Sequence, residues 1–214
     1  MGRLFHTIHR VPTTFEPGGD GCLSIFADVY ETGALIFPVG ARVLEIGCAE
    51  ADWMTPMLRA RPDLQIHGID WRDSGDRPAP VVRGDVLTHE YPPASFDAVV
   101  GISSIEHVGL GHYANDPIDI DGDRHCMARV ARWLKPGGRV FIVEYCPAPA
   151  WMPAQRLLLP LTKWFLRLAR MPLVFLHERG FYEASLAANG FCDITARRIH
   201  SPGVSEWAWF PIFI

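Results

Sequence analysis

The chain has 214 residues, of which 49% are hydrophobic and 21% are charged, and its formal net charge is −4. This length suits one domain with a full-sized core, and the composition excludes a largely disordered chain. The mildly acidic balance is not that of a general nucleic-acid binder, whose surface carries an excess of basic residues. We therefore expect a single domain over residues 1–214 with no nucleic-acid partner.

Targeting segments and metal-binding cysteine patterns are not evident. The first residues hold no apolar run of signal-peptide length, and no stretch of about 18 uncharged apolar residues offers a membrane span. The five cysteines are scattered without a Cys-x-x-Cys pair, which is typical of reduced thiols rather than of a disulfide framework or a zinc site. We expect a cytoplasmic protein.

The predicted elements begin with an N-terminal arm and helix within residues 1–40. From Arg42 onward, short apolar strands alternate with helical segments, and this alternation predicts a parallel sheet with right-handed crossovers. A helix over residues 121–134 has its apolar side chains at core spacing and is ended by Lys135-Pro-Gly-Gly138. A second helix, over residues 181–188, ends at Asn189-Gly190. Strands are expected near residues 42–46, 65–69, 80–83, 96–102, 139–145, 191–200 and 207–213.

Three strand ends in succession carry residues suited to a nucleotide-like ligand. The first strand runs into Gly47, the second ends at Asp70, and the third leads into Asp85. A glycine turn brings backbone amides close to such a ligand, and an acid at the next strand tip accepts ribose hydroxyls. A nicotinamide-dependent enzyme would carry Gly-x-Gly-x-x-Gly in the first turn, whereas the sequence here is Gly47-Cys-Ala-Glu-Ala-Asp52. Hydride transfer is therefore the less favoured hypothesis.

With these residues the chain resembles the class I S-adenosylmethionine (SAM) dependent methyltransferases over about residues 42–200. The resemblance implies a Rossmann-like α/β fold: a seven-stranded, mostly parallel sheet with helices on both faces and an antiparallel last strand. Ala49 and Ala51 depart from the family, which usually has glycine there, and their methyl groups narrow the space for backbone approach. The matching motifs are Glu45-Ile-Gly47-Cys48, Gly68-Ile-Asp70, Gly84-Asp85-Val86, Phe96 to Ser103, and Leu134 to Val143.

The resemblance also implies SAM as the cofactor and a role for each matching residue. The turn at Gly47 offers backbone amides, Asp70 accepts the ribose hydroxyls, and Asp85 accepts the adenine amino group beside the Val86 amide. Glu45 is expected to orient the cofactor's ammonium group through water. Trp71 either covers the adenine face or is a rim or core aromatic. The predicted cofactor-binding residues are Glu45, Gly47, Cys48, Ala49, Asp70, Trp71, Asp85, Val86 and Ser103.

A cluster of polar residues after the fourth strand supplies candidates for catalysis. It lies at the carboxyl edge of the sheet, where open α/β sheets bind their ligands. An imidazole titrates near neutral pH and suits the removal of a hydroxyl proton. We predict His107 as general base, oriented by Glu106 or an aspartate, in O-methylation of a small-molecule acceptor; a packing role for His107 is the alternative. The predicted acceptor-binding residues are His112, Tyr113 and Asp116.

The same loop contains acids and histidines that resemble a metal site only superficially. A calcium-loop alignment fails because its first ligand position would be Pro117 and its twelfth Ala128. Asp121-Gly-Asp123 is better explained by helix capping, so no metal is predicted. The runs from Ser103 to Tyr113 and from Pro117 to Asp123 resemble a bacterial subgroup of uncharacterised methyltransferase-like proteins, often linked to sugar or surface-glycan pathways.

Residues 145–177 form a segment outside the minimal α/β unit. The segment contains no Asp or Glu, and Lys163, Arg167 and Arg170 fall on one helical face, opposite an apolar face. It is a lid over the acceptor, a contact of residues 151–176 with anionic lipid, or a packed insertion. Two alternative functions follow: methylation of a lipid-like or prenylated acceptor at a membrane surface, or SAM binding without catalysis. The oligomeric state is not predicted.

Overall fold

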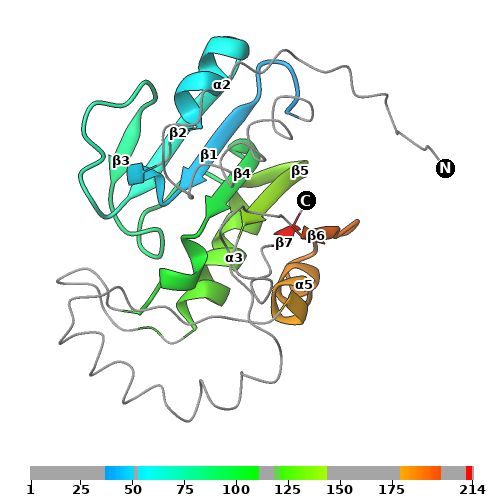
Figure 1. Ribbon diagram of the computed structural model, residues 1–214. Coiled ribbons are helices and arrows are strands. Elements are labelled where there is room, and N and C mark those ends of the chain that lie inside the picture. Colours follow the sequence, from blue (N-terminus) through cyan, green and yellow to red (C-terminus); the bar gives the residue numbers. More distant parts are fainter. Residues whose placement is uncertain are drawn as a thin grey trace.

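The structure, a computed structural model, describes residues 37–50, 53–110, 119, 121–143, 179–198 and 211–213. In this part of the chain a twisted sheet lies between helices (Figure 1). The strands are β1 (Arg42–Ile46), β2 (Gln65–Asp70), β3 (Val81–Arg83), β4 (Phe96–Ile102), β5 (Leu134–Val143), β6 (Ala196–Arg198) and β7 (Pro211–Phe213). The α-helices are α2 (Met54–Ala60), α3 (Gly122–Trp133) and α5 (Arg179–Ala188), and the 3₁₀ helices are η1 (Cys48–Glu50) and η2 (Ile105–His107).

The strand order in the sheet is β3-β2-β1-β4-β5-β7-β6. Strand β1 lies in the middle and pairs in parallel with both β2 and β4, and β3 and β5 extend the parallel sheet on either side. Strand β7 pairs antiparallel with β5 and β6. The five parallel strands confirm the predicted Rossmann-like α/β fold. The order reverses between β1 and β4, and in open α/β sheets ligands bind at the carboxyl ends of the strands beside such a reversal.

Two hydrophobic cores cover the two faces of the sheet. Successive side chains of a strand point to opposite faces, so Val43 of β1 packs with Met54 and Met57 of α2, whereas its neighbour Leu44 packs with α3 and α5. Figure 1 shows α2 on one side of the sheet and the other two α-helices on the opposite side. Helices therefore lie on both faces, as predicted, and hold the carboxyl ends of the strands in a fixed arrangement.

Strand β5 begins earlier than the sequence predicts. Leu134 leaves the helical conformation directly after α3, with ψ of 140°, and pairs with Phe96. The register then shifts before the next pair, Ala98 with Arg139. Residues 135–138 therefore end α3 as predicted, but they form an irregularity within the strand rather than a loop before it. Gly137 permits this irregularity because its φ is +75°.

The observed α3 and α5 match the two predicted helices to within two residues at either end. Helix α5 is followed by Asn189 and Gly190, and Gly190 adopts a φ of +85°, as expected for a glycine that ends a helix. None of the helices in the described ranges is long and apolar enough to cross a bilayer. The predicted N-terminal helix and the segment 145–177 lie outside the described residues.

The packing of β2 against the turn after β1 can be tested by mutation, because the two segments lie very close together. A Cβ on Gly68 would lie 2.5 Å from Cys48 Sγ and 3.1 Å from Cys48 Cβ. Because Cys48 is fully buried, we expect Gly68→Ala to lower the free energy of unfolding by about 1–3 kcal/mol. In the control Gly180→Ala, nothing lies within 4 Å of the added methyl group, so stability should be unchanged or rise by up to ~1 kcal/mol. Urea denaturation measures both, and equal stability of Gly68→Ala and wild type would contradict the close approach.

Candidate functional site

The turn after β1 requires glycine at residue 47. Gly47 has a φ of +79°, and its N–H donates a 2.9 Å hydrogen bond to the carbonyl oxygen of Ile69 in β2. A Cβ at this position would lie 2.5 Å from Cβ of Ser104, which follows β4. The turn is therefore held between the carboxyl ends of β2 and β4, and a larger residue would be both strained and crowded.

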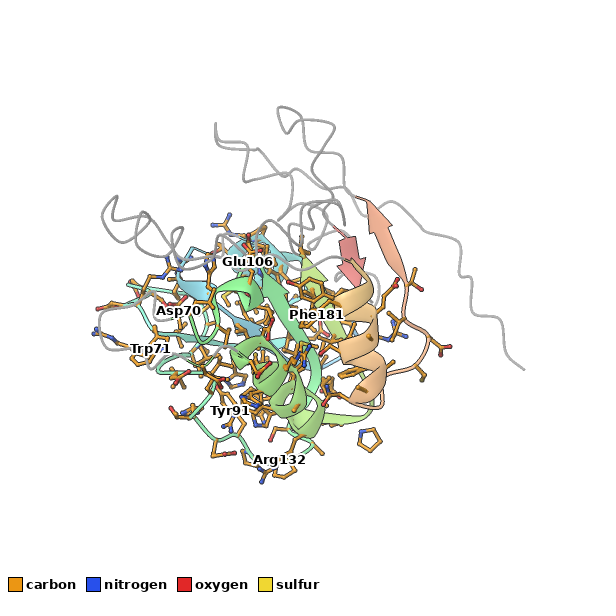
Figure 2. The ribbon with its side chains drawn as sticks, turned by 90° about the horizontal axis from the view of Figure 1, so that it is seen from below. Asp70, Trp71, Tyr91, Glu106, Arg132 and Phe181 are labelled. Carbon is orange, nitrogen blue, oxygen red and sulfur yellow. The ribbon has the colours of Figure 1, made fainter. Side chains whose placement is uncertain are left out.

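Asp70, the last residue of β2, is bound to the same turn. Its residue exposure is only 6%, and its Oδ2 accepts the Ala49 N–H at 2.8 Å. The backbone amide of Ala49 was predicted to face the cofactor, but the structure directs it to the predicted ribose acid. The reason is local: the start of a 3₁₀ helix leaves an N–H without a helical partner, and a nearby carboxylate satisfies it. Trp71 is half-buried and lies beside Asp70 (Figure 2).

Cys48 contributes to the core rather than to a ligand surface. Its side chain is completely buried against Gly68. Burial raises the pKa of the Cys48 thiol to about 11, although the Ser74 hydroxyl, 3.8 Å from the sulfur, opposes the shift. The prediction that Cys48 binds the cofactor can therefore concern only its backbone, because the side chain faces away from solvent.

Asp85 lies next to Asp70 at the neighbouring strand end. Gly84, which follows β3, donates its N–H to the carbonyl oxygen of Asp70 at 2.9 Å. Asp85 is 7% exposed, and its Oδ1 accepts the Leu87 N–H at 2.7 Å. Its Oδ2 has no hydrogen-bond partner in the described part of the chain. The carbonyl oxygen of Val86 accepts Nε of Arg129 at 2.9 Å, which ties this segment to α3.

Glu45 is sealed inside the protein beneath the turn. It is 1% exposed, and its Oε2 accepts the indole Nε1–H of Trp53 at 2.7 Å. Burial raises the pKa of Glu45 well above its ordinary value, while the hydrogen bond from Trp53 and the charge of Arg77 oppose this only in part. This internal hydrogen bond occupies one carboxyl oxygen of Glu45, and the predicted water-mediated contact with the cofactor's ammonium group stays a prediction. Sequence reasoning missed Trp53; its signal is an indole, which needs an acceptor when buried, close to a buried acid.

The structure brings the predicted catalytic residues together after β4. Ser103 has a φ of +47°, and its hydroxyl donates to Oε1 of Glu106 at 3.0 Å. Glu106 is 6% exposed, and its Oε2 is buried without a hydrogen-bond partner among the residues that the structure describes. Nε2 of His107 lies 3.7 Å from Glu106 Oε1, which is an ion-pair distance when the ring is protonated and too long for a hydrogen bond. His107 is only partly buried and is accessible to solvent.

Two arginines that the sequence reasoning missed surround the turn. Arg72 forms an ion pair with Asp70, with 3.2 Å between Nε and Oδ1. Arg77 donates from Nη2 to the carbonyl oxygen of Ala49 and from Nε to that of Ser74, the latter at 3.0 Å. The signal for both is the arginine-rich segment that directly follows the ribose acid in the sequence.

The loop before α3 differs from the prediction in its capping. Asp121 occupies the N-cap position of α3, yet its side chain makes no capping hydrogen bond and instead lies 3.8 Å from Arg124. Asp119 accepts the backbone N–H of Asp121 at 3.1 Å and pairs with Nδ1 of His125 at 2.6 Å. Within the described ranges, no three His, Cys, Asp or Glu residues are placed to hold a metal ion. The predicted acceptor-binding residues His112, Tyr113 and Asp116 lie outside these ranges.

Comparison with known families assigns the chain to one of them. A family model described as a methyltransferase domain matches residues 3–195. The chain therefore belongs to this methyltransferase-domain family, which confirms its resemblance to the class I SAM-dependent methyltransferases. The narrower resemblance to the glycan-linked subgroup stays a prediction.

Individual relatives cover a range of acceptors. The chain is 28% identical over 138 residues to the 27-O-demethylrifamycin SV methyltransferase of Amycolatopsis mediterranei, a match covering 57% of this chain and 46% of that protein. The chain thus spans about half the length of this curated relative. Among solved structures, 1,6-didemethyltoxoflavin-N1-methyltransferase of Burkholderia thailandensis, with S-adenosylhomocysteine (SAH) bound, has a TM-score of 0.60 and 14% identity over 90% of this chain and 76% of its own. Phosphoethanolamine N-methyltransferase 2 of Haemonchus contortus, in complex with SAM, has a TM-score of 0.55 and 18% identity over 81% of this chain and 38% of its own.

The buried Glu45 predicts a specific pH dependence of stability. A carboxyl group whose pKa is raised by folding contributes stability that is complete below its unfolded-state pKa, near 4.5, and that is lost as the pH rises through the folded-state pKa. Glu45→Gln keeps an oxygen acceptor for Trp53 but cannot ionise. We expect its free energy of unfolding to rise relative to wild type as the pH increases from 5 to 8, by at most about 1.4 kcal/mol per pH unit. A difference that is independent of pH in urea denaturation would contradict this.

Proposed function

We propose that this member of the methyltransferase-domain family binds SAM at the carboxyl ends of β1, β2 and β3 and methylates a small molecule, with a hydroxyl oxygen as the favoured acceptor. One observation carries the proposal: two buried carboxylates, Asp70 and Asp85, stand at neighbouring strand ends beside the left-handed turn at Gly47. Burying two carboxylates costs free energy unless each one is hydrogen-bonded to protein groups or to a ligand. The family assignment makes SAM the matching ligand.

The residues present fit this cofactor. The oxygen of Asp85 that has no partner is suited to an adenine amino group, since an amino group is a donor and a carboxylate accepts. We propose that Asp70 accepts the ribose hydroxyls and that Trp71, which lies beside Asp70 in Figure 2, flanks the adenine. When bound, SAM supplies an electrophilic methyl group, so the protein mainly has to position the acceptor and remove a proton.

The acceptor side of the site is formed by η2. Glu106 holds Ser103 with one oxygen and leaves the other buried and without a partner. A buried carboxylate oxygen of this kind gains free energy from any hydrogen-bond donor that reaches it. We propose that it binds the acceptor's hydroxyl group or fixes the ring of His107, which takes the proton as the methyl group is transferred. The O-demethylated substrate in the name of the 28% identical relative supports an oxygen acceptor.

The two alternatives drawn from the sequence remain distinct proposals. Methylation of a lipid-like or prenylated acceptor would use residues 151–176, which lie outside the described residues. A peripheral membrane contact of a cytoplasmic protein through the same residues is part of this alternative proposal. A SAM-binding protein without turnover is motivated by Ala49 and Ala51. Calorimetry with SAM and SAH separates the proposals from one another: no binding of either compound would remove all of them, and binding without methyl consumption would favour the non-catalytic protein.

Asp85 is the sharpest test of the cofactor site. We expect Asp85→Asn to weaken SAM binding by about 10- to 100-fold, because it replaces a charge-assisted hydrogen bond with an amide that can present a donor to the adenine amino group. Asp76→Asn is the matched control, since Asp76 is an exposed acid in the loop after β2 and should leave the affinity unchanged. Isothermal titration calorimetry measures both, and equal affinities of Asp85→Asn and wild type would refute the adenine contact.

His107 is tested by separating turnover from binding. We expect His107→Gln to lower kcat by about 10²- to 10⁴-fold, as for loss of a general base, while the dissociation constant of SAM changes less than about twofold. The assay follows SAH formation with hydroxyl acceptors, beginning with 27-O-demethylrifamycin SV. Equal losses in kcat and in SAM affinity would mean that His107 has a structural role.

A further inference from the structure

The carboxylate of Asp70 is already saturated with hydrogen-bond donors. Oδ1 accepts the backbone N–H of Arg72 at 2.8 Å and Nε of the same residue at 3.2 Å. Oδ2 accepts the Ala49 N–H at 2.8 Å and Nη2 of Arg72 at 3.3 Å. A carboxylate offers about four lone-pair positions, and these four donors use them. A ligand hydroxyl that approaches Asp70 therefore finds no vacant acceptor.

The neighbouring acid differs in this respect. Asp85 receives one backbone N–H, from Leu87 at 2.7 Å, and its second oxygen has no hydrogen-bond partner among the described residues. Of the two acids proposed to hold the adenosyl group, Asp85 has an oxygen without a hydrogen-bond partner among the described residues, whereas both oxygens of Asp70 are occupied by donors. Arg72 alone makes this difference, since it supplies three of the four donors on Asp70.

Of these four donors, the two from the guanidinium group are the removable ones. The amides of Ala49 and Arg72 are fixed by the backbone. The guanidinium contacts, at 3.2 and 3.3 Å, are longer than the usual 2.7–2.9 Å of charge-assisted bonds. The side chain of Arg72 is 36% exposed, whereas that of Asp70 is 3% exposed. The guanidinium contacts with Asp70 are therefore the ones that a competing donor can replace, because an ion pair with a partly exposed partner is weak.

We infer that the Arg72 guanidinium is a displaceable cover on Asp70, which competes with the two hydroxyls of the cofactor's ribose for the same carboxylate oxygens. This rests on the proposed function, in which Asp70 binds that ribose. The apparent affinity for the cofactor is reduced because only the fraction of protein molecules in which Arg72 does not occupy Asp70 can bind the ribose there. In the absence of cofactor, the guanidinium group adds two donors to a buried carboxylate that would otherwise have only the two backbone N–H groups among the described residues. Arg72 thus sets how tightly the site holds its adenosyl ligand.

The test measures SAH binding by isothermal titration calorimetry. SAH is used because it carries no sulfonium charge, so loss of an arginine does not act on it through long-range attraction or repulsion. We expect Arg72→Met to bind SAH about two- to tenfold more tightly than wild type. Arg72→Lys should fall between them, since a single ammonium group cannot span both oxygens as the guanidinium does. The control Arg83→Met removes an equal charge from an exposed residue whose Nε donates to the Trp71 backbone carbonyl oxygen at 3.3 Å, and it should leave the affinity unchanged.

Two further readouts separate competition from a general effect on the fold. In an Asp70→Asn background, Arg72→Met should give no gain in SAH affinity, because the uncharged amide, in which an NH₂ donor replaces one oxygen, no longer attracts the guanidinium group. Raising the salt concentration from about 0.05 to about 0.5 M should tighten SAH binding to wild type but not to Arg72→Met, since salt weakens the partly exposed ion pair. Thermal unfolding of each variant confirms that it is folded at the assay temperature.

The outcomes distinguish this inference from the proposed function. If wild type binds SAH and Arg72→Met binds it equally or more weakly, the cover is refuted and the proposed function stands. If Arg72→Met also tightens SAH binding in the Asp70→Asn background, competition at Asp70 is refuted and the proposed function again stands. If wild type binds neither SAM nor SAH, the proposed function fails, and the inference fails with it.

Discussion

A buried carboxylate, Asp70, fastens the end of β2 to the turn that follows β1. Its hydrogen bond with the Ala49 amide joins two elements that lie 21 residues apart in the sequence. Because a buried carboxylate loses free energy when a hydrogen-bond donor is removed from it, this contact constrains both the turn and the strand end. The close packing of Gly47 on Ser104 extends the constraint to the end of β4. The carboxyl ends of three central strands are thereby held together, and the candidate site is built on them.

The three buried acids at this edge of the sheet differ in the hydrogen-bond donors that stabilise their carboxyl groups. Glu45 is deeply buried with one indole donor, and burial raises its pKa. Asp70 is held by four donors, whereas Asp85 has one and keeps an oxygen without a partner. The difference lies in the donors that each neighbourhood supplies. The three carboxylates therefore differ in how much of their hydrogen-bonding capacity the protein itself uses.

The family assignment and the fold do not by themselves determine the acceptor. Relatives of similar fold carry names that place the methyl group on oxygen or on nitrogen, as expected where function resides in the site and not in the scaffold. For this chain the informative group on the proposed acceptor side is Glu106, which is buried and has one oxygen without a partner in the described part of the chain. Such a group favours an acceptor that brings a hydrogen-bond donor.

The sequence by itself determined the five parallel strands, the two helices near residues 122–133 and 179–188, the glycine turn, and the acids at the strand ends. These features depend on local periodicity and on the conformational freedom of glycine, both of which are visible in consecutive residues. Only the tertiary structure decided the partners of the acids: Trp53 for Glu45, and Ala49 with Arg72 for Asp70. It also turned the Cys48 side chain into the core, left the Asp121 side chain without a capping hydrogen bond, and moved the start of β5 to Leu134. Such outcomes depend on which segments the sheet brings together and how deeply each side chain is buried, and no local pattern encodes these.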